Sequence, residues 1–129
     1  MGQQEIELVM GTLEAFNQRE FDAVGTKYRE DATIRYPQSG ESIHGRDRLL
    51  GMLGAFEHPP RWTVTQARSM DGGVIVEAEA DYGEGAVWKT VLLYEITNGL
   101  ISNEVAYFGA PFEPADWRAS FVTIEKGRT

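Results

Sequence analysis

The sequence predicts an α+β domain in which three N-terminal helices pack on one face of a curved, mostly antiparallel sheet. Two observations lead to this prediction. Apolar residues recur at helical spacing in the first part of the chain, and alternating segments separated by glycine-containing turns fill most of the rest. A chain of 129 residues is long enough for one domain with its own core, so residues 1–129 are treated as a single domain.

Three segments have the apolar spacing of amphipathic helices. Residues 3–17 carry the first stripe, which is formed by Ile6, Val9, Met10, Leu13 and Phe16. Residues 20–29 repeat the pattern briefly, and this places Tyr28 on the apolar side of a second helix. A third helix follows Gly45 and ends before two prolines at 59 and 60. Its expected core side chains are Leu49, Leu50, Leu53 and Phe56.

The other segments are predicted to be strands and turns. Residues 32–36 form a short strand that ends at Pro37, and residues 38–41 follow as a loop. Four longer strands are expected at residues 62–70, 74–82, 86–97 and 100–108. Asn98-Gly99 is a strong signal for a type I′ hairpin turn, because both central positions of that turn need a positive φ. A short helix over residues 115–124 is expected to close the domain.

Composition excludes several classes of function. A net charge of −8 and a pI near 4.7 argue against a nucleic-acid-binding surface and against binding to anionic membranes. Without cysteine there is no disulfide, thiol nucleophile or thiolate metal site, and the two histidines lie far apart in the sequence. We therefore expect neither a metal nor a cofactor. The first residues do not resemble a signal peptide and no apolar segment approaches the roughly 20 residues of a membrane span, so a cytoplasmic protein is expected.

The turns predict which strand residues share a face of the sheet. A two-residue loop at Asn98-Gly99 pairs Leu93 with Glu104, and a loop of about four residues at 83–86 pairs Val76 with Leu93. One face is then small and apolar, apart from a single carboxylate. Its members are Val74, Val76, Ala78, Ala80, Val91, Leu93, Glu104, Ala106 and Phe108. A carboxylate on such a face must find a partner or shift its pKa upward.

The opposite face mixes acidic residues with large aromatic and aliphatic ones. Its predicted members are Glu77, Glu79, Asp81, Trp88, Thr90, Leu92, Tyr94, Ile101, Val105 and Tyr107. This composition is typical of a solvated surface that contains a patch for self-association.

Two stretches of the sequence resemble a known family. YPQSGESIHGRDRL (36–49) and NGLISNEVAYFGAPFEPADWR (98–118), together with the order of the predicted elements, resemble the nuclear transport factor 2-like superfamily and its SnoaL-like (polyketide cyclase-like) group. The resemblance implies a cone-shaped cavity between the helices and the concave face of the sheet. It also implies a homodimer formed through the exposed sheet face. The superfamily contains isomerases, dehydratases, epoxide hydrolases, polyketide cyclases and non-enzymes, so the resemblance is specific for the fold and not for an activity.

The catalytic members of this family carry an acid on the last long strand, commonly directly before an aromatic pair. The aromatic pair here is Tyr107-Phe108, but the residue before it is Ala106. This departure argues against the usual polyketide-cyclase and ketosteroid-isomerase chemistry, although Glu104 lies two residues earlier on the same face. The related epoxide hydrolases use an Asp–Arg–Asp set that residues 88–96 do not contain, which excludes that activity.

These observations select a set of candidate site residues. Glu104 is the candidate general base or acid, and Tyr36 or His44 is the candidate group that polarises a substrate oxygen. Lys89 is expected near the open end of the cavity, where it could pair with Glu104 or hold an anionic ligand. The expected ligand-binding residues are Tyr28, Val76, Ala78, Lys89, Val91, Leu93, Ala106 and Phe108.

Three functions remain open from the sequence. The first is a cofactor-free isomerase, dehydratase or cyclase that acts on a small apolar molecule with a carbonyl or hydroxyl group. The second is a protein that binds such a molecule without chemistry. The third is a structural dimer whose interior is filled. A raised pKa of Glu104 would favour the first, whereas a paired carboxylate in a collapsed interior would favour the third.

Overall fold

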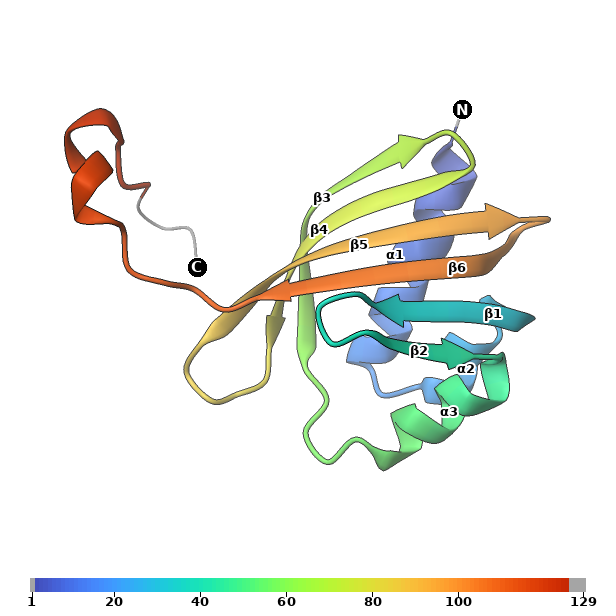
Figure 1. Cartoon of the computed structure of the whole chain (residues 1–129). Helices are drawn as coiled ribbons and strands as arrows, with labels where there is room; N and C mark the ends of the chain where they lie inside the picture. Colours follow the sequence, from blue (N-terminus) through green and yellow to red (C-terminus); the bar gives the residue numbers. More distant parts are fainter. Residues whose placement is uncertain (1, 126–129) are drawn as a thin grey trace.

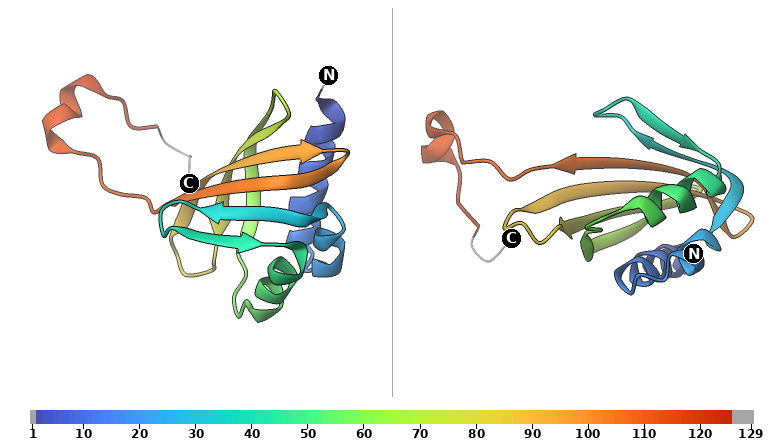
Figure 2. Two further views of the ribbon diagram at one scale, coloured as in Figure 1. Left: turned by 45° about the vertical axis from the view of Figure 1, so that its right-hand side comes forward. Right: turned by 90° about the horizontal axis from the view of Figure 1, so that it is seen from below.

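The computed structural model describes residues 2–125, and it has a six-stranded sheet with helices packed on one face (Figures 1 and 2). The helices are α1 (Gln3–Asn17), α2 (Phe21–Gly25) and α3 (Arg46–Ala55). The strands are β1 (Tyr28–Tyr36), β2 (Glu41–His44), β3 (Arg61–Met70), β4 (Gly73–Asp81), β5 (Val87–Thr97) and β6 (Leu100–Gly109). A short 3₁₀ helix, η1 (Asp116–Phe121), follows β6.

The sheet is curved, open and mostly antiparallel. Its strand order is β2-β1-β6-β5-β4-β3, so β2 and β3 form the edges. The single parallel pair is β1 with β6, which brings the first long strand beside the last. The α+β class, the three helices and the meander predicted from the sequence are therefore confirmed, and the predicted turn at Asn98 and Gly99 has a positive φ at both residues.

Three local predictions are wrong. The second helix ends at Gly25, and Tyr28 is the first residue of β1. Residue 41, which was predicted in a loop, begins the edge strand β2, whose pairing with β1 no local pattern indicated. The predicted closing helix is only the 3₁₀ helix η1, and none of its residues is buried.

The core lies between the helices and the inner face of the sheet. Helix α1 contributes Val9, Leu13 and Phe16, and α3 contributes Leu49 and Leu53. The predicted stripe residue Met10 is instead 39% exposed, and Phe56 lies just beyond the end of α3 and is 36% exposed. No helix within residues 2–125 is long and apolar enough to cross a membrane.

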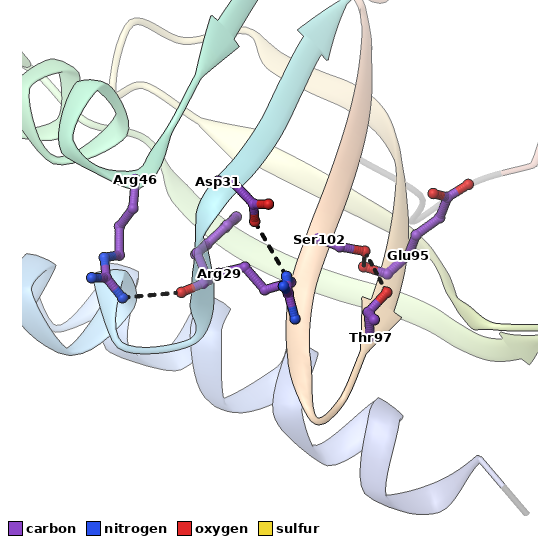
Figure 3. A network of polar contacts seen from close by, with 7 residues as sticks. Arg29, Asp31, Arg46, Glu95, Thr97 and Ser102 are labelled. Atoms are coloured by element: carbon purple, nitrogen blue, oxygen red, sulfur yellow. Dashed lines mark hydrogen bonds and ion pairs between the residues drawn. The ribbon is translucent and has the colours of Figure 1, made fainter.

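The register between β5 and β6 differs by one residue from the predicted one. Thr97 pairs with Leu100 and Ile96 with Ile101, but Glu95 pairs with Asn103, so Ser102 is an extra residue on β6. This bulge is held by side chains (Figure 3): the Ser102 hydroxyl donates to the Glu95 carbonyl at 3.1 Å, and Thr97 Oγ1 donates to Ser102 Oγ at 3.0 Å. The bulge changes which β5 residues share a face with Glu104.

The predicted β4–β5 register is also wrong by one residue, because Val76 pairs with Leu92 and not with Leu93. The predicted inner face is therefore right for β4 and for Glu104, Ala106 and Phe108 of β6, but wrong for β5. Ile101, which was predicted on the outer face, is buried in the core. Glu104 lies opposite Tyr94, and Ala106 lies opposite Leu92. The predicted inner residues Val91, Leu93 and Lys89 point to the outer face. The β5 residues that the sequence analysis assigned to the outer face belong to the inner one, and these are Trp88, Thr90, Leu92 and Tyr94.

Candidate functional site

A pocket lies between the helices and the inner face of the sheet. The space in it that is open to water is about 70 Å³, enough for a few waters or a small organic molecule. Its walls are mostly apolar and come from α1, α3 and the inner faces of the strands. The polar lining residues are one threonine, four tyrosines, one tryptophan and one glutamate, namely Thr12, Tyr28, Tyr36, Tyr82, Tyr94, Trp62 and Glu104.

Glu104 is the charged residue of this lining. It lies on β6 between Ile34 of β1 and Tyr94 of β5, and the hydroxyl of Tyr28 donates a hydrogen bond to its Oε1. Tyr28 is itself positioned by its backbone, because Arg46 at the start of α3 donates to the Tyr28 carbonyl at 3.4 Å (Figure 3). The carboxylate is therefore fixed at one oxygen by a side chain from the neighbouring strand.

The surroundings of Glu104 raise its pKa from 4.5 to about 7. Burial is the cause of the increase, because an apolar wall solvates the charged form poorly. The hydrogen bond from Tyr28 acts in the opposite direction, since it stabilises the carboxylate. A group with this pKa is present in both its charged and neutral forms near neutral pH.

Two further tyrosines share this part of the pocket. Burial, and next the charge of Glu104, raise the pKa of Tyr36 and of Tyr94. Both side chains therefore keep their protons and can act as hydrogen-bond donors. The Tyr36 hydroxyl contacts Met52 Sδ at 3.9 Å, and a thioether is a weak acceptor, so this hydroxyl can turn to a ligand oxygen at small cost.

One wall of the pocket is aromatic. Trp62 packs edge-on against Phe16 and lies 6.0 Å, centroid to centroid, from Phe108, which in turn lies 6.4 Å from Tyr36. The indole Nε1 of Trp62 is buried and has no acceptor among the described residues. A ligand oxygen could satisfy this donor.

Two side-chain amides hold the strand ends that form this wall. Asn17, the last residue of α1, accepts from the backbone N–H of Trp62 at 2.7 Å and donates to its carbonyl at 2.8 Å. Gln38 accepts from the backbone N–H of Phe108 at 2.6 Å and donates to the Phe108 carbonyl. Each side-chain amide thus makes the two backbone hydrogen bonds that a residue of a neighbouring strand would otherwise make. In this way each amide fixes the backbone of one aromatic residue of the pocket.

The structure brings together some of the residues that the sequence predicted for the site. Glu104 and Tyr36 both line the pocket, and so do Tyr28, Ala106 and Phe108. Tyr28 reaches it from β1 and not from a helix.

The other predicted residues do not line the pocket. His44 is exposed at the end of β2, and Val76 and Ala78 are buried in the core behind the lining. Lys89 is on the outer face, where its Nζ lies 2.7 Å from Glu79 Oε2. Val91 and Leu93 are on the same outer face because of the changed β5 register.

Sequence reasoning missed Tyr94, Trp62, Met52 and Tyr82 as pocket residues. Tyr94 was assigned to the outer face, and two one-residue changes of register reverse that assignment. One is the bulge at Ser102 on the β6 side, and the other is the pairing of Val76 with Leu92 instead of Leu93 on the β4 side. No local signal in the sequence indicates that bulge. Within residues 2–125, no three His, Asp or Glu side chains gather closely enough to hold a metal ion.

The chain is similar to known proteins in both sequence and fold. The profile of the SnoaL-like domain matches residues 9–104. An NTF2-like protein of unknown function from Burkholderia xenovorans is 31% identical, with a TM-score of 0.86 over 95% of this chain and 96% of that one. Comparison with curated proteins gives no match.

Two more distant structures show the same fold. A Kribbella flavida protein that has been proposed to be a ketosteroid isomerase is 22% identical, with a TM-score of 0.87 over 97% of this chain and 92% of that one. An LEH-like epoxide hydrolase from Mycobacterium tuberculosis is 17% identical, with a TM-score of 0.68 over 81% of this chain and 82% of that one. Because the profile covers most of the sequence, the chain belongs to the SnoaL-like domain family of the NTF2-like superfamily.

Proposed function

We propose that this protein is a cofactor-free enzyme that moves a proton on a small apolar molecule with a carbonyl or hydroxyl group. The observation that carries the proposal is the placement of Glu104 as an acid in an apolar pocket, beside several tyrosine hydroxyls and with a pKa raised to about 7. A general base works best when its pKa lies near the working pH.

In the proposed reaction the Glu104 carboxylate takes a proton from the carbon next to a carbonyl group. Tyr28 occupies Oε1, so Oε2 is the oxygen that would accept the proton. The electron pair of the broken C–H bond moves into the carbonyl, and the Tyr36 hydroxyl donates a hydrogen bond to the resulting enolate oxygen. The protonated Glu104 then returns the proton to a different carbon in an isomerisation, or to a leaving hydroxyl in a dehydration.

The size and chemistry of the pocket restrict the substrate. About 70 Å³ of open space accommodates a small molecule and is below the 300–1,000 Å³ of typical drug-sized sites. Aromatic walls favour an apolar body, and the donors on Tyr36, Tyr94 and Trp62 favour an acceptor oxygen. A small ketone fits both requirements.

The alternative is a protein that binds such a molecule without chemistry. The hydrogen bond from Tyr28 favours it, because one oxygen of Glu104 is already satisfied within the fold. Under this alternative Glu104 would accept a hydrogen bond from a ligand hydroxyl and transfer no proton.

Deuterium exchange distinguishes the two functions. We would incubate the protein in D₂O with the smallest enolisable ketones, such as acetone and butanone, and follow loss of the α-proton signal by ¹H NMR. We expect faster exchange than in buffer, a loss of about 10²- to 10⁴-fold in Glu104→Gln, and a smaller loss in Tyr36→Phe. His44→Ala is the matched control and should be unchanged, because His44 is exposed and outside the pocket.

Binding is measured on the same samples by amide chemical-shift changes. Ketones that shift the amides of β6 without faster exchange would indicate the binding function. If no ketone produces either effect, both proposals for this pocket are wrong for this class of molecule.

A further inference from the structure

Residues 110–125 form a segment that stands away from the sheet, and we refer to it as the C-terminal arm. Both views in Figure 2 and the view in Figure 1 show it extending beyond the end of β6. Three aromatic residues of the arm are almost fully exposed: Phe112 at 82%, Trp117 at 78% and Phe121 at 84%. Val122 and Ile124 are also exposed. Single exposed apolar residues are ordinary, but this density within one short segment indicates a surface that another molecule covers.

The arm is built to remain extended. Pro111 and Pro114 have fixed φ angles, and each restricts the residue before it to extended conformations. Beyond them η1 presents Trp117, whose ring is covered on one side by the Arg118 guanidinium at 5.7 Å. The prolines therefore direct the aromatic residues away from the domain that carries them.

The outer face of the sheet carries a second unpartnered apolar surface. Ile75, Leu93 and Val105 lie side by side across β4, β5 and β6, and Val91 and Tyr107 form the adjacent row. We refer to these five residues as the outer patch. Val91 is 38% exposed and Tyr107 is 42% exposed. The outer patch extends to the end of β6, the point from which the arm departs.

We propose that two copies of the chain exchange their C-terminal arms, each packing its aromatic residues on the outer patch of the other copy. Both surfaces belong to one chain, and a two-fold arrangement covers both arms and both patches at once. The sequence resemblance led us to expect a dimer through the sheet face. The new element is the exchanged arm, which requires Phe112, Trp117 and Phe121 for association.

The arrangement has a consequence for the pocket. Tyr107 of the outer patch lies between Ala106 and Phe108, which line the pocket on the other side of β6. An arm packed on Tyr107 would therefore support the strand that carries Glu104. Exchange of the arms does not depend on whether the pocket is catalytic.

The first test is the mass of the full-length protein in solution, measured by light scattering during size exclusion. We expect a dimer. Phe112→Ser/Trp117→Ser/Phe121→Ser should weaken the dimer by about 100-fold or more, since buried aromatic anchors dominate interface energies. Because these side chains are exposed, the circular dichroism spectrum should be unchanged. Val91→Glu should also weaken the dimer, whereas Thr63→Glu, at an exposed position on the edge strand β3, should not.

The second test locates the arm by disulfide formation, which is feasible because the chain contains no cysteine. Trp117→Cys and Val91→Cys are made separately, mixed and oxidised. We expect a covalent heterodimer that mass spectrometry identifies, whereas Trp117→Cys mixed with Thr63→Cys should give far less.

Three results would overturn the proposal. The first is a monomer at all accessible concentrations. The second is a dimer that is unaffected by the triple serine substitution. The third is a disulfide within one chain of the double variant Val91→Cys/Trp117→Cys, which would show that the arm folds back on its own domain.

Discussion

At the scale of single residues, Glu104 determines what the pocket can do. Its position on β6 places a carboxylate among apolar and aromatic side chains, and burial raises its pKa to about 7. Tyr28 limits this increase by donating to Oε1. The balance between the two effects keeps the group able to take up and release a proton near neutral pH.

The first prediction concerns the pH dependence of the proposed reaction. A base must be ionised to accept a proton, so kcat/KM for α-proton exchange should increase with pH and level off above about 7. A carboxyl ¹³C NMR titration, assigned with Glu104→Gln, should show the same midpoint. A midpoint near 4.5 would contradict the proposed chemistry, because the carboxylate would then be a weak base.

The second prediction concerns Tyr28. Tyr28→Phe removes the hydrogen bond that lowers the pKa of Glu104, so the titration midpoint should move above that of the unmodified protein. Tyr36→Phe is the matched control, because the Tyr36 hydroxyl contacts Met52 and does not bond to Glu104. If both variants titrate like the parent, the Tyr28 contact does not stabilise the carboxylate.

The third prediction links Glu104 to stability. The folded protein holds the Glu104 proton up to a pH of about 7, whereas the unfolded chain releases it near 4.5. The free energy of unfolding should therefore fall between these two pH values, by about 3 kcal/mol from this group. Glu104→Gln cannot ionise, so urea denaturation should show the variant gaining stability relative to the parent as the pH rises from 4 to 8. If the difference in unfolding free energy between the variant and the parent stays constant from pH 4 to 8, Glu104 does not become a buried charge.

At the scale of elements, local sequence signals explain the turn at Asn98-Gly99 but not the bulge at Ser102. Asn98-Gly99 forms its turn because both residues tolerate a positive φ, and this depends on the two residues alone. The bulge at Ser102 depends on pairing with β5 and on hydrogen bonds that reach Glu95 and Thr97. The turn was therefore predictable and the bulge was not.

The fourth prediction concerns the link between α1 and β3. Asn17→Ala removes both hydrogen bonds to the Trp62 backbone and leaves a half-buried N–H unpaired, which should cost about 2 kcal/mol in urea denaturation. Gln18→Ala is the matched control, since Gln18 is exposed and its side chain bonds to Glu14 within the same helix end. A loss no larger than that of the control would mean that the amide does not hold the strand.

At the scale of the whole molecule, the pocket is formed by packing of α1 and α3 against the inner face of the sheet. Ala106 is 1% exposed and lines the pocket between Glu104 and Phe108 on β6. A small side chain at this position leaves space that a larger one would occupy.

The fifth prediction uses that space. Ala106→Leu should fill part of the roughly 70 Å³ and weaken binding of a small ketone at least tenfold, with a loss of stability of about 1–3 kcal/mol from crowding at a buried position. Amide shift titration with butanone measures the binding, and His44→Ala serves as the control. Unchanged binding would place the ligand elsewhere on the molecule.

The sequence by itself determined the α+β class, the presence of the first and third helices, the Asn98-Gly99 hairpin turn and the inward position of Glu104. These depend on apolar spacing, turn chemistry and the alternation of one strand, all of which act over a few residues. The tertiary structure decided the face of β5, because one extra residue in β6 reverses which β5 side chains oppose Glu104. It also placed Tyr28 on β1 and Tyr94 in the pocket, and it left the C-terminal arm off the domain. Each of these depends on contacts between segments far apart in the chain, which local sequence patterns do not specify.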